Sequence, residues 1–217
     1  MSSPIVDELL RRNKEYADSV HKPLPLLHGS DGKLRQGSRA VIGQYHFPSQ
    51  RRPRKSDSTM AHTYDRLSVT CADPRIIPES FLGFRLPNNS PMGRLELTTS
   101  TYLAIPVIRV IGGRAIHAIE NIVGLDAAFG VDTVVLVHHK DCGLTHFDEA
   151  RLKATLRKRF PEQGAMIETI AFGAIGKLGQ SLVDDAVFIK QHPLVRGEVV
   201  VKGFMYDIEG GLLEEVV

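Results

Sequence analysis

One continuous apolar run constrains the fold of this chain more than any other feature. Residues 132–137 read Asp-Thr-Val-Val-Leu-Val, a β-branched run without polar interruption after its first two residues. Such a run is typical of a central parallel strand that is covered on both faces of its sheet. It leads directly into His138 and His139, and Cys142 follows three residues later. The run therefore predicts an α/β sheet with chemically active side chains at the carboxyl end of a core strand.

Strand and helix patterns alternate along much of the chain. Further strands are predicted at 66–70, 105–111 and 199–203, with a turn at Gly210-Gly211 and a short edge strand within 206–215. Helical patterns cover 5–18, 115–129, 148–159, 163–172 and 180–191, and Gly130 is placed to cap the second of these. This alternation predicts an α/β fold with a mostly parallel central sheet flanked by helices.

The length of 217 residues corresponds to one main domain with extensions. We expect an N-terminal helix within 1–20, a basic, Pro-, Gly- and Ser-rich arm or loop over 21–64, and an α/β domain over 65–217. The arm contains Arg-Arg-Pro-Arg-Lys at 51–55, which is either an anion or partner site or simply solvated charge on a loop.

Charge and composition exclude several classes of protein. Lys and Arg number 27 and Asp and Glu 25, so the chain lacks the strongly basic balance of a general nucleic-acid binder. No apolar stretch is long enough to span a membrane, and the acidic N-terminal segment resembles neither a secretory signal nor a transit peptide. Two cysteines are too few for a disulfide framework, so we expect a cytoplasmic protein with reduced thiols.

Two motifs carry the candidate chemistry. Cys71-Ala-Asp73-Pro-Arg75 follows the strand predicted at 66–70, and His139-Lys-Asp-Cys142-Gly follows the strand predicted at 132–137. If these strands are neighbours, two thiols and an imidazole converge at one edge of the sheet. Such a ligand set suits zinc (Zn2+), and three protein ligands leave the fourth position open, as in catalytic sites.

Two other interpretations of these ligands remain open. The cysteines are explained equally by burial as small apolar core residues. One of them could also be a nucleophile with His139 as its base, although the second cysteine would then have no role.

The neighbouring polar residues also have alternative interpretations. Asp73 and Arg75 could form a charge-assisted pair that holds the carboxylate off the metal. Released from that pair, Asp73 could fill the fourth position, and a simple surface ion pair is the plainer alternative. We do not expect His138 or His146 to be ligands, because the alternation of a strand turns His138 to the opposite face from His139.

Taken together, the two motifs resemble the signature of the β-class carbonic anhydrases. Further matches to this family are Leu-Arg-Arg-Asn-Lys-Glu-Tyr-Ala at 10–17, Gly-Gly-Arg at 112–114 and the segment 203–212. The resemblance covers most of 66–217 together with the first helix.

The resemblance implies a structure and an activity. Zinc would be held by Cys71, His139 and Cys142, with a catalytic pair at Asp73 and Arg75. Four parallel strands would form the sheet with a fifth strand at its edge. The family forms homodimers or multiples of dimers, with the N-terminal helix packed on a partner subunit. A zinc-bound hydroxide would hydrate CO2 reversibly to bicarbonate and a proton.

Departures from the family pattern leave two alternatives open. Val110 stands where the family usually has Asn, and the segments 29–64 and 85–105 are longer than usual. A related zinc hydrolase on the same scaffold, such as a carbon disulfide hydrolase, is one alternative. A catalytically silent zinc-binding homologue is the other.

Overall fold

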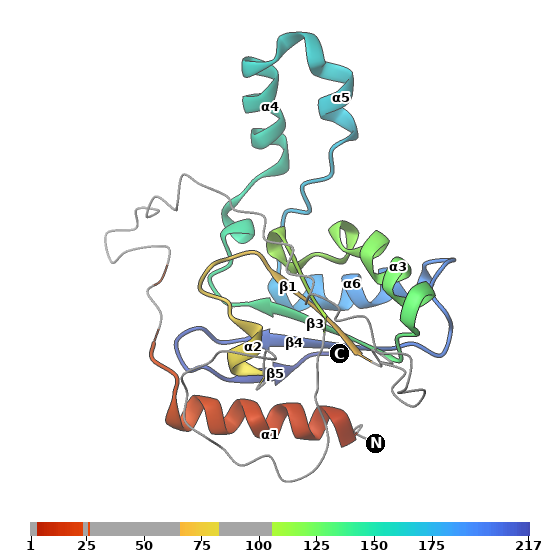
Figure 1. Cartoon of the computed structure of the whole chain (residues 1–217). Coiled ribbons are helices and arrows are strands. Elements are labelled where there is room, and N and C mark those ends of the chain that lie inside the picture. The colour runs from red at the N-terminus through yellow and green to blue at the C-terminus, as the bar shows by residue number, and fades with distance from the viewer. Residues whose placement is uncertain (1–3, 24–25, 27–65, 83–105) are drawn as a thin grey trace, which may run out of the picture.

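The computed structural model describes residues 4–23, 26, 66–82 and 106–217 (Figure 1). Of the predicted arm at 21–64, only residues 21–23 and 26 belong to these ranges. The basic run at 51–55 and the long segment at 85–105 lie outside the described residues, so their roles stay predictions.

A five-stranded, mostly parallel sheet forms the centre of the fold, as predicted. Its strand order is β2-β1-β3-β4-β5, the first four strands running parallel and β5 antiparallel to β4. The strands are β1 (Arg66–Cys71), β2 (Val107–Val110), β3 (Thr133–His139), β4 (Val200–Tyr206) and β5 (Leu213–Glu215).

Helices cover both faces of this sheet (Figure 1). They are α1 (Pro4–Ser19), α2 (Pro78–Phe81), α3 (Ile119–Phe129), α4 (Glu149–Arg159), α5 (Gly164–Thr169) and α6 (Leu178–Gln191). The helices α3 and α6 pack on one face and α1 and α2 on the other, while α4 and α5 project away from the sheet. Of the helices in the described ranges, none combines the length and the apolar character that crossing a bilayer requires.

Several element boundaries differ from the sequence prediction. The strand predicted at 105–111 ends at Val110, because Gly112 and Gly113 take positive φ values that a strand cannot continue through. The helix predicted at 115–129 is divided into a 3-10 turn, η2 (Ala115–His117), and α3. The segment 206–215, expected to hold a turn and a short edge strand, begins inside β4, which ends at Tyr206.

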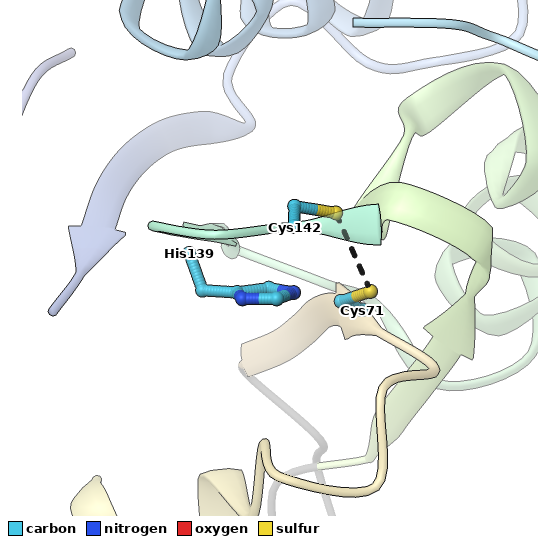
Figure 2. A group of neighbouring side chains, drawn as sticks. All are labelled: Cys71, His139 and Cys142. Atoms are coloured by element: carbon cyan, nitrogen blue, oxygen red, sulfur yellow. Dashed lines mark hydrogen bonds between the residues drawn. The ribbon is translucent and has the colours of Figure 1, made fainter. Parts of the chain in front are cut away.

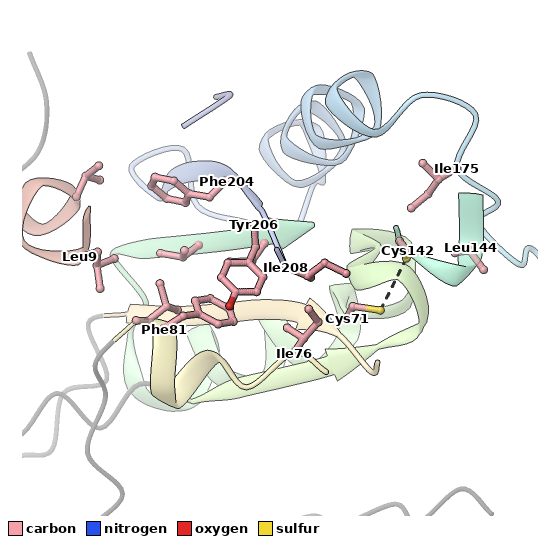
Figure 3. Close-up of a cluster of buried hydrophobic side chains, with 14 residues drawn as sticks. Leu9, Cys71, Ile76, Phe81, Cys142, Leu144, Ile175, Phe204, Tyr206 and Ile208 are labelled. Carbon is pink, nitrogen blue, oxygen red and sulfur yellow. Dashed lines mark hydrogen bonds between the residues drawn. The ribbon is translucent and has the colours of Figure 1, made fainter. Parts of the chain in front are cut away.

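The strand β3 divides the core into two clusters because its side chains alternate between the faces and all seven of its residues are buried. Val134 and Leu136 pack toward α3 and α6, and Val135 and Val137 toward α1 and α2. Figure 3 shows the second cluster, in which the rings of Phe81 and Tyr206 stack with centroids 4.2 Å apart.

Helix α1 packs on its own chain through a buried polar anchor. The amide of Asn13 donates to the carbonyl of Gly211 at 2.9 Å and accepts from the backbone N–H of Leu213 at 2.8 Å. Val6 and Leu9 of the same helix face enter the core. The expected packing of α1 on a partner subunit stays a prediction.

Candidate metal centre

The fold brings Cys71, His139 and Cys142 together at the carboxyl edge of the sheet (Figure 2). Strands β1 and β3 are parallel neighbours, with Thr70 paired to Val137, so their ends lie side by side. Cys71 is the last residue of β1 and His139 the last of β3, and the chain then turns to present Cys142. The predicted convergence of the three side chains is therefore observed.

The distances suit a shared metal ion. The two Sγ atoms lie 3.9 Å apart, and all three ligand atoms lie within 4.8 Å of one another. Zinc–sulfur bonds of about 2.3 Å at tetrahedral angles place two sulfurs about 3.8 Å apart. A disulfide would need about 2.05 Å, and both cysteines are free and buried. The pair therefore fits two thiolate ligands of one ion.

His139 is oriented as a metal ligand. Its Nδ1 lies 2.9 Å from the carbonyl oxygen of Lys140, to which it donates, so the lone pair of the neutral ring is on Nε2. That Nε2 is buried and has no hydrogen-bond partner. Metal-bound histidines commonly donate their other N–H to a carbonyl in this way. The orphaned Nε2 is thus explained by a metal ion.

Without a cation, one of the two thiols ionises more readily than both do together. A hydrogen bond with Cys142 lowers the pKa of Cys71, with help from His139 and against the effect of burial. The neighbouring Cys71 and burial raise the pKa of Cys142. A cation at the site offsets this repulsion, so metal binding and loss of the second proton are coupled.

Asp73 and Arg75 form the predicted pair at the edge of this ligand set. The Arg75 guanidinium donates from Nη2 to Asp73 Oδ2 at 2.7 Å and from Nε to Oδ1 at 3.0 Å. Burial alone would raise the pKa of Asp73, but the hydrogen bonds from the side chain and backbone of Arg75 hold it below its ordinary value. Asp73 Oδ2 lies 3.9 Å from His139 Nε2, so an ionised carboxylate borders the metal position.

Asp141 is a site residue that the sequence interpretation missed. Its carboxylate accepts from Arg75 Nη1 at 2.7 Å, and its backbone carbonyl accepts from Arg75 Nη2 at 2.8 Å. The signal available in the sequence was an acidic residue directly before the second cysteine of a ligand motif.

His138 and His146, which lie near these motifs in the sequence, are not part of the group of three side chains. His138 faces α6, where its Nδ1 lies 2.9 Å from Ser181 Oγ and its Nε2 3.3 Å from Asp185 Oδ2. His146 lies next to Asp141, with its Nε2 3.7 Å from Asp141 Oδ1.

A buried ion pair that sequence reasoning did not identify supports the β3 end from α6. Arg114 donates from Nε to Asp185 Oδ2 at 2.9 Å and from Nη1 to the carbonyl of Gly173 at 2.7 Å. Burial opposes ionisation of Asp185, but the neighbouring His138 and Arg114 outweigh it and lower the pKa. This pair joins the turn after β2 to α6 directly behind the ligand-bearing strand.

The backbone of Gly113 closes the inner side of the site. A Cβ atom at this position would lie 2.9 Å from the carbonyl oxygen of Val137 and 3.2 Å from the backbone nitrogen of Cys71. Val110, which departs from the family pattern, is half-buried and packs with the α3–α6 cluster, and its carbonyl accepts from Ala72 N–H at 2.9 Å. The turn therefore joins the ends of β1, β2 and β3 without the Asn side chain.

An open depression of about 540 Å³ lies along the segment that follows Cys142. It is lined by residues 145–150 of the segment that follows Cys142 and by residues 174–176 that lead into α6. Leu144 and Ile175 pack with Cys142 at its inner side (Figure 3). None of the three candidate ligands lines this depression.

Three solved carbonic anhydrases share this fold. The structure superposes on the carbonic anhydrase from Glaciozyma antarctica with a TM-score of 0.59 and 26% sequence identity, over 71% of this chain and 83% of that one. The enzyme from Streptococcus mutans gives 0.57 and 19% over the whole of both chains. The β-carbonic anhydrase isoform I of Trichomonas vaginalis gives 0.52 and 15%, over 71% and 83%.

A carbon disulfide hydrolase also has this fold, with a TM-score of 0.53 and 19% identity over 70% of this chain and 78% of that one. No family model matches the sequence, and no curated protein matches it. The fold and the Cys-His-Cys group define an α/β protein with a candidate metal centre. In its fold the chain is similar to carbonic anhydrases, one of them named as a β-carbonic anhydrase.

Proposed function

We propose that this chain is a zinc-dependent carbonic anhydrase that interconverts CO2 and bicarbonate. The observation that carries the proposal is the position of Asp73, an Arg-paired carboxylate whose Oδ2 lies 3.9 Å from the Nε2 of the candidate ligand His139. A structural zinc site has four protein ligands and needs no such neighbour. Three ligands with an oriented acceptor beside them fit a site that activates water.

Cys71, His139 and Cys142 would hold the ion. Their thiolate and imidazole donors, and the 3.9 Å separation of the two sulfurs, match what zinc prefers. When bound, zinc supplies the Lewis acidity that makes water a nucleophile at neutral pH, as is general for carbonic anhydrases.

Asp73 would orient the reacting water. An ionised carboxylate only accepts hydrogen bonds, so Asp73 fixes the direction of a water O–H and leaves the lone pair of that oxygen free for the carbon of CO2. Arg75 makes this possible by holding both oxygens of Asp73 in place. Released from Arg75, the same carboxylate would become a fourth ligand and close the site.

The experiment that tests the function is stopped-flow CO2 hydration on protein whose zinc content has been assayed, over a range of about pH 6.5 to 9. We expect about one zinc per chain and a rate that rises with pH. Full zinc content with no hydration would contradict the proposal. Carbon disulfide is offered in parallel, and turnover of it alone would assign the chain to the related hydrolases.

We also propose that the chain acts as a homodimer or a multiple of dimers in the cytoplasm. Exposed apolar side chains on and after α6, at Val187, Phe188 and Leu194, support self-association. Two thiol ligands that must stay reduced support a reducing compartment. Light scattering after size-exclusion chromatography tests the assembly, and a mass of about 24 kDa, that of one chain, would contradict it.

A further inference from the structure

Arg75 is held from two sides by carboxylates. On one side it donates to Asp73, and on the other its Nη1 donates to Asp141 Oδ2 at 2.7 Å. The three side chains are between 10% and 14% exposed, so water competes little for these hydrogen bonds. The orientation of Arg75 therefore depends on both partners.

The backbone of Asp141 is shaped for this contact. Its φ is +55°, and among the described residues it is the only residue other than glycine with a positive φ. This conformation is unfavourable for most L-residues and is tolerated best by Asn and Asp. It allows both the carbonyl and the carboxylate of Asp141 to accept from the same guanidinium.

Asp73 lies close enough to compete for the metal. Its Oδ2 is 3.9 Å from His139 Nε2, and its backbone N–H lies 3.4 Å from Cys71 Sγ. A carboxylate is a good zinc ligand, so the position of Asp73 is decided by what holds it away. Arg75 is the group that holds it, and Arg75 is in turn held by Asp141.

We propose that Asp141 is a positioning residue that keeps the fourth position of the metal site open. It holds the Arg75 guanidinium in place, and the guanidinium in turn holds the Asp73 carboxylate away from the metal. The proposal rests on the metal-binding part of the proposed function and is independent of the substrate. A merely structural ion pair between Asp141 and Arg75 would stabilise the fold without controlling access to the metal. The two roles differ in what happens to an exogenous ligand.

The test uses the full chain loaded with cobalt(II), whose visible spectrum reports its ligands, and azide as a small anion that competes for the fourth position. The variants are Asp141→Asn and Asp141→Gly, both of which tolerate a positive φ. Asp132→Asn is the matched control, since it removes an exposed carboxylate at the opposite end of β3.

We expect azide to change the spectrum of the wild type and of Asp132→Asn with the same dissociation constant. In Asp141→Asn the dissociation constant for azide should rise about tenfold, and in Asp141→Gly it should rise by more. The reason is that Asp73 then occupies the fourth metal position. Adding Asp73→Ala to either Asp141 variant should restore the azide response, since the competing carboxylate is gone.

Unchanged azide affinity in both Asp141 variants would overturn the proposal. So would a weakened affinity that the added Asp73→Ala does not restore, because Asp141 would then act on the fold alone. CO2 hydration is measured separately on the zinc-loaded wild type. A failure of the proposed activity is thus seen there, while the cobalt spectra still decide the role of Asp141.

Discussion

The Sγ atoms of Cys71 and Cys142 lie 3.9 Å apart although 71 positions separate the two residues in the chain. This proximity is a consequence of topology, because β1 and β3 are parallel neighbours and their carboxyl ends share one edge of the sheet. Loops at this edge are where ligands collect in parallel α/β folds. The shared edge, more than either motif alone, creates the candidate metal centre.

Replacement of Cys142 by Ser should remove metal affinity and activity together. A hydroxyl does not ionise at neutral pH and cannot replace a thiolate ligand. Zinc content after dialysis and the hydration rate are measured on the same sample. Ser68→Ala, a small change at a buried β1 position outside the ligand set, serves as the control and should keep its zinc. Full metal retention in Cys142→Ser would remove Cys142 from the ligand set.

Replacement of Asp73 by Ala should leave zinc bound and slow turnover by about 10- to 100-fold, since the water loses the acceptor that orients it. Asp73→Asn is the informative companion, because its amide keeps the size of the side chain but not its charge. Zinc content and the pH profile of hydration are recorded for both variants. Unchanged kinetics in Asp73→Ala would exclude Asp73 from the mechanism.

Much of the fold and the meeting of the three ligands could be predicted from the sequence. The β-branched run at 132–137 is typical of a buried strand, and the predicted strand ends placed Cys71 and His139 at one edge of the sheet. The role of Asp141 could not be predicted, because it depends on a positive φ and on Arg75 reaching across 66 positions. Nor could the Arg114–Asp185 pair, since no local spacing relates residues on a turn and a distant helix.

Removal of the metal should destabilise the fold. A ligand at about 1,000 times its dissociation constant contributes about 4 kcal/mol to the free energy of unfolding. For a chain of this size that corresponds to a fall in Tm of about 8–16 °C. Thermal unfolding is followed by circular dichroism with zinc and with excess chelator, and added zinc should reverse the change. An identical Tm with zinc and with chelator would show that no metal binds the folded chain with appreciable affinity.

Asp126 should make the stability depend on pH in a predictable direction. It accepts from Arg196 Nη2 at 2.8 Å and from the backbone N–H of Val131 at 2.8 Å, and the hydrogen bond from Arg196 is the main cause of its lowered pKa. Because the pKa of Asp126 is lower in the folded state, the charged carboxylate stabilises the fold at pH values above its unfolded-state pKa of about 3.9. This stabilisation is lost as the pH falls through the folded-state pKa.

The variant Asp126→Asn should therefore lose about 1 kcal/mol of unfolding free energy near pH 7 and less than that near pH 3. Urea unfolding at both pH values measures the difference. Asp132→Asn, an exposed carboxylate nearby in the sequence, should change the stability little at either pH. A loss for Asp126→Asn that is equal at both pH values would show that its charge does not contribute.

Replacement of Gly113 by Ala should damage both the fold and the metal centre. The residue has φ +69°, and a Cβ there would lie 2.9 Å from the Val137 carbonyl oxygen and 3.2 Å from the Cys71 nitrogen. We expect a loss of about 1–3 kcal/mol from backbone strain, with a further loss of zinc affinity because Cys71 must shift. Gly124→Ala is the matched control: it lies in α3 with nothing within 4 Å of the added Cβ, and it should gain up to about 1 kcal/mol. Urea unfolding and zinc titration are measured on both variants. If Gly113→Ala were as stable as Gly124→Ala and bound zinc as tightly, the close backbone approach at Gly113 would not support the site.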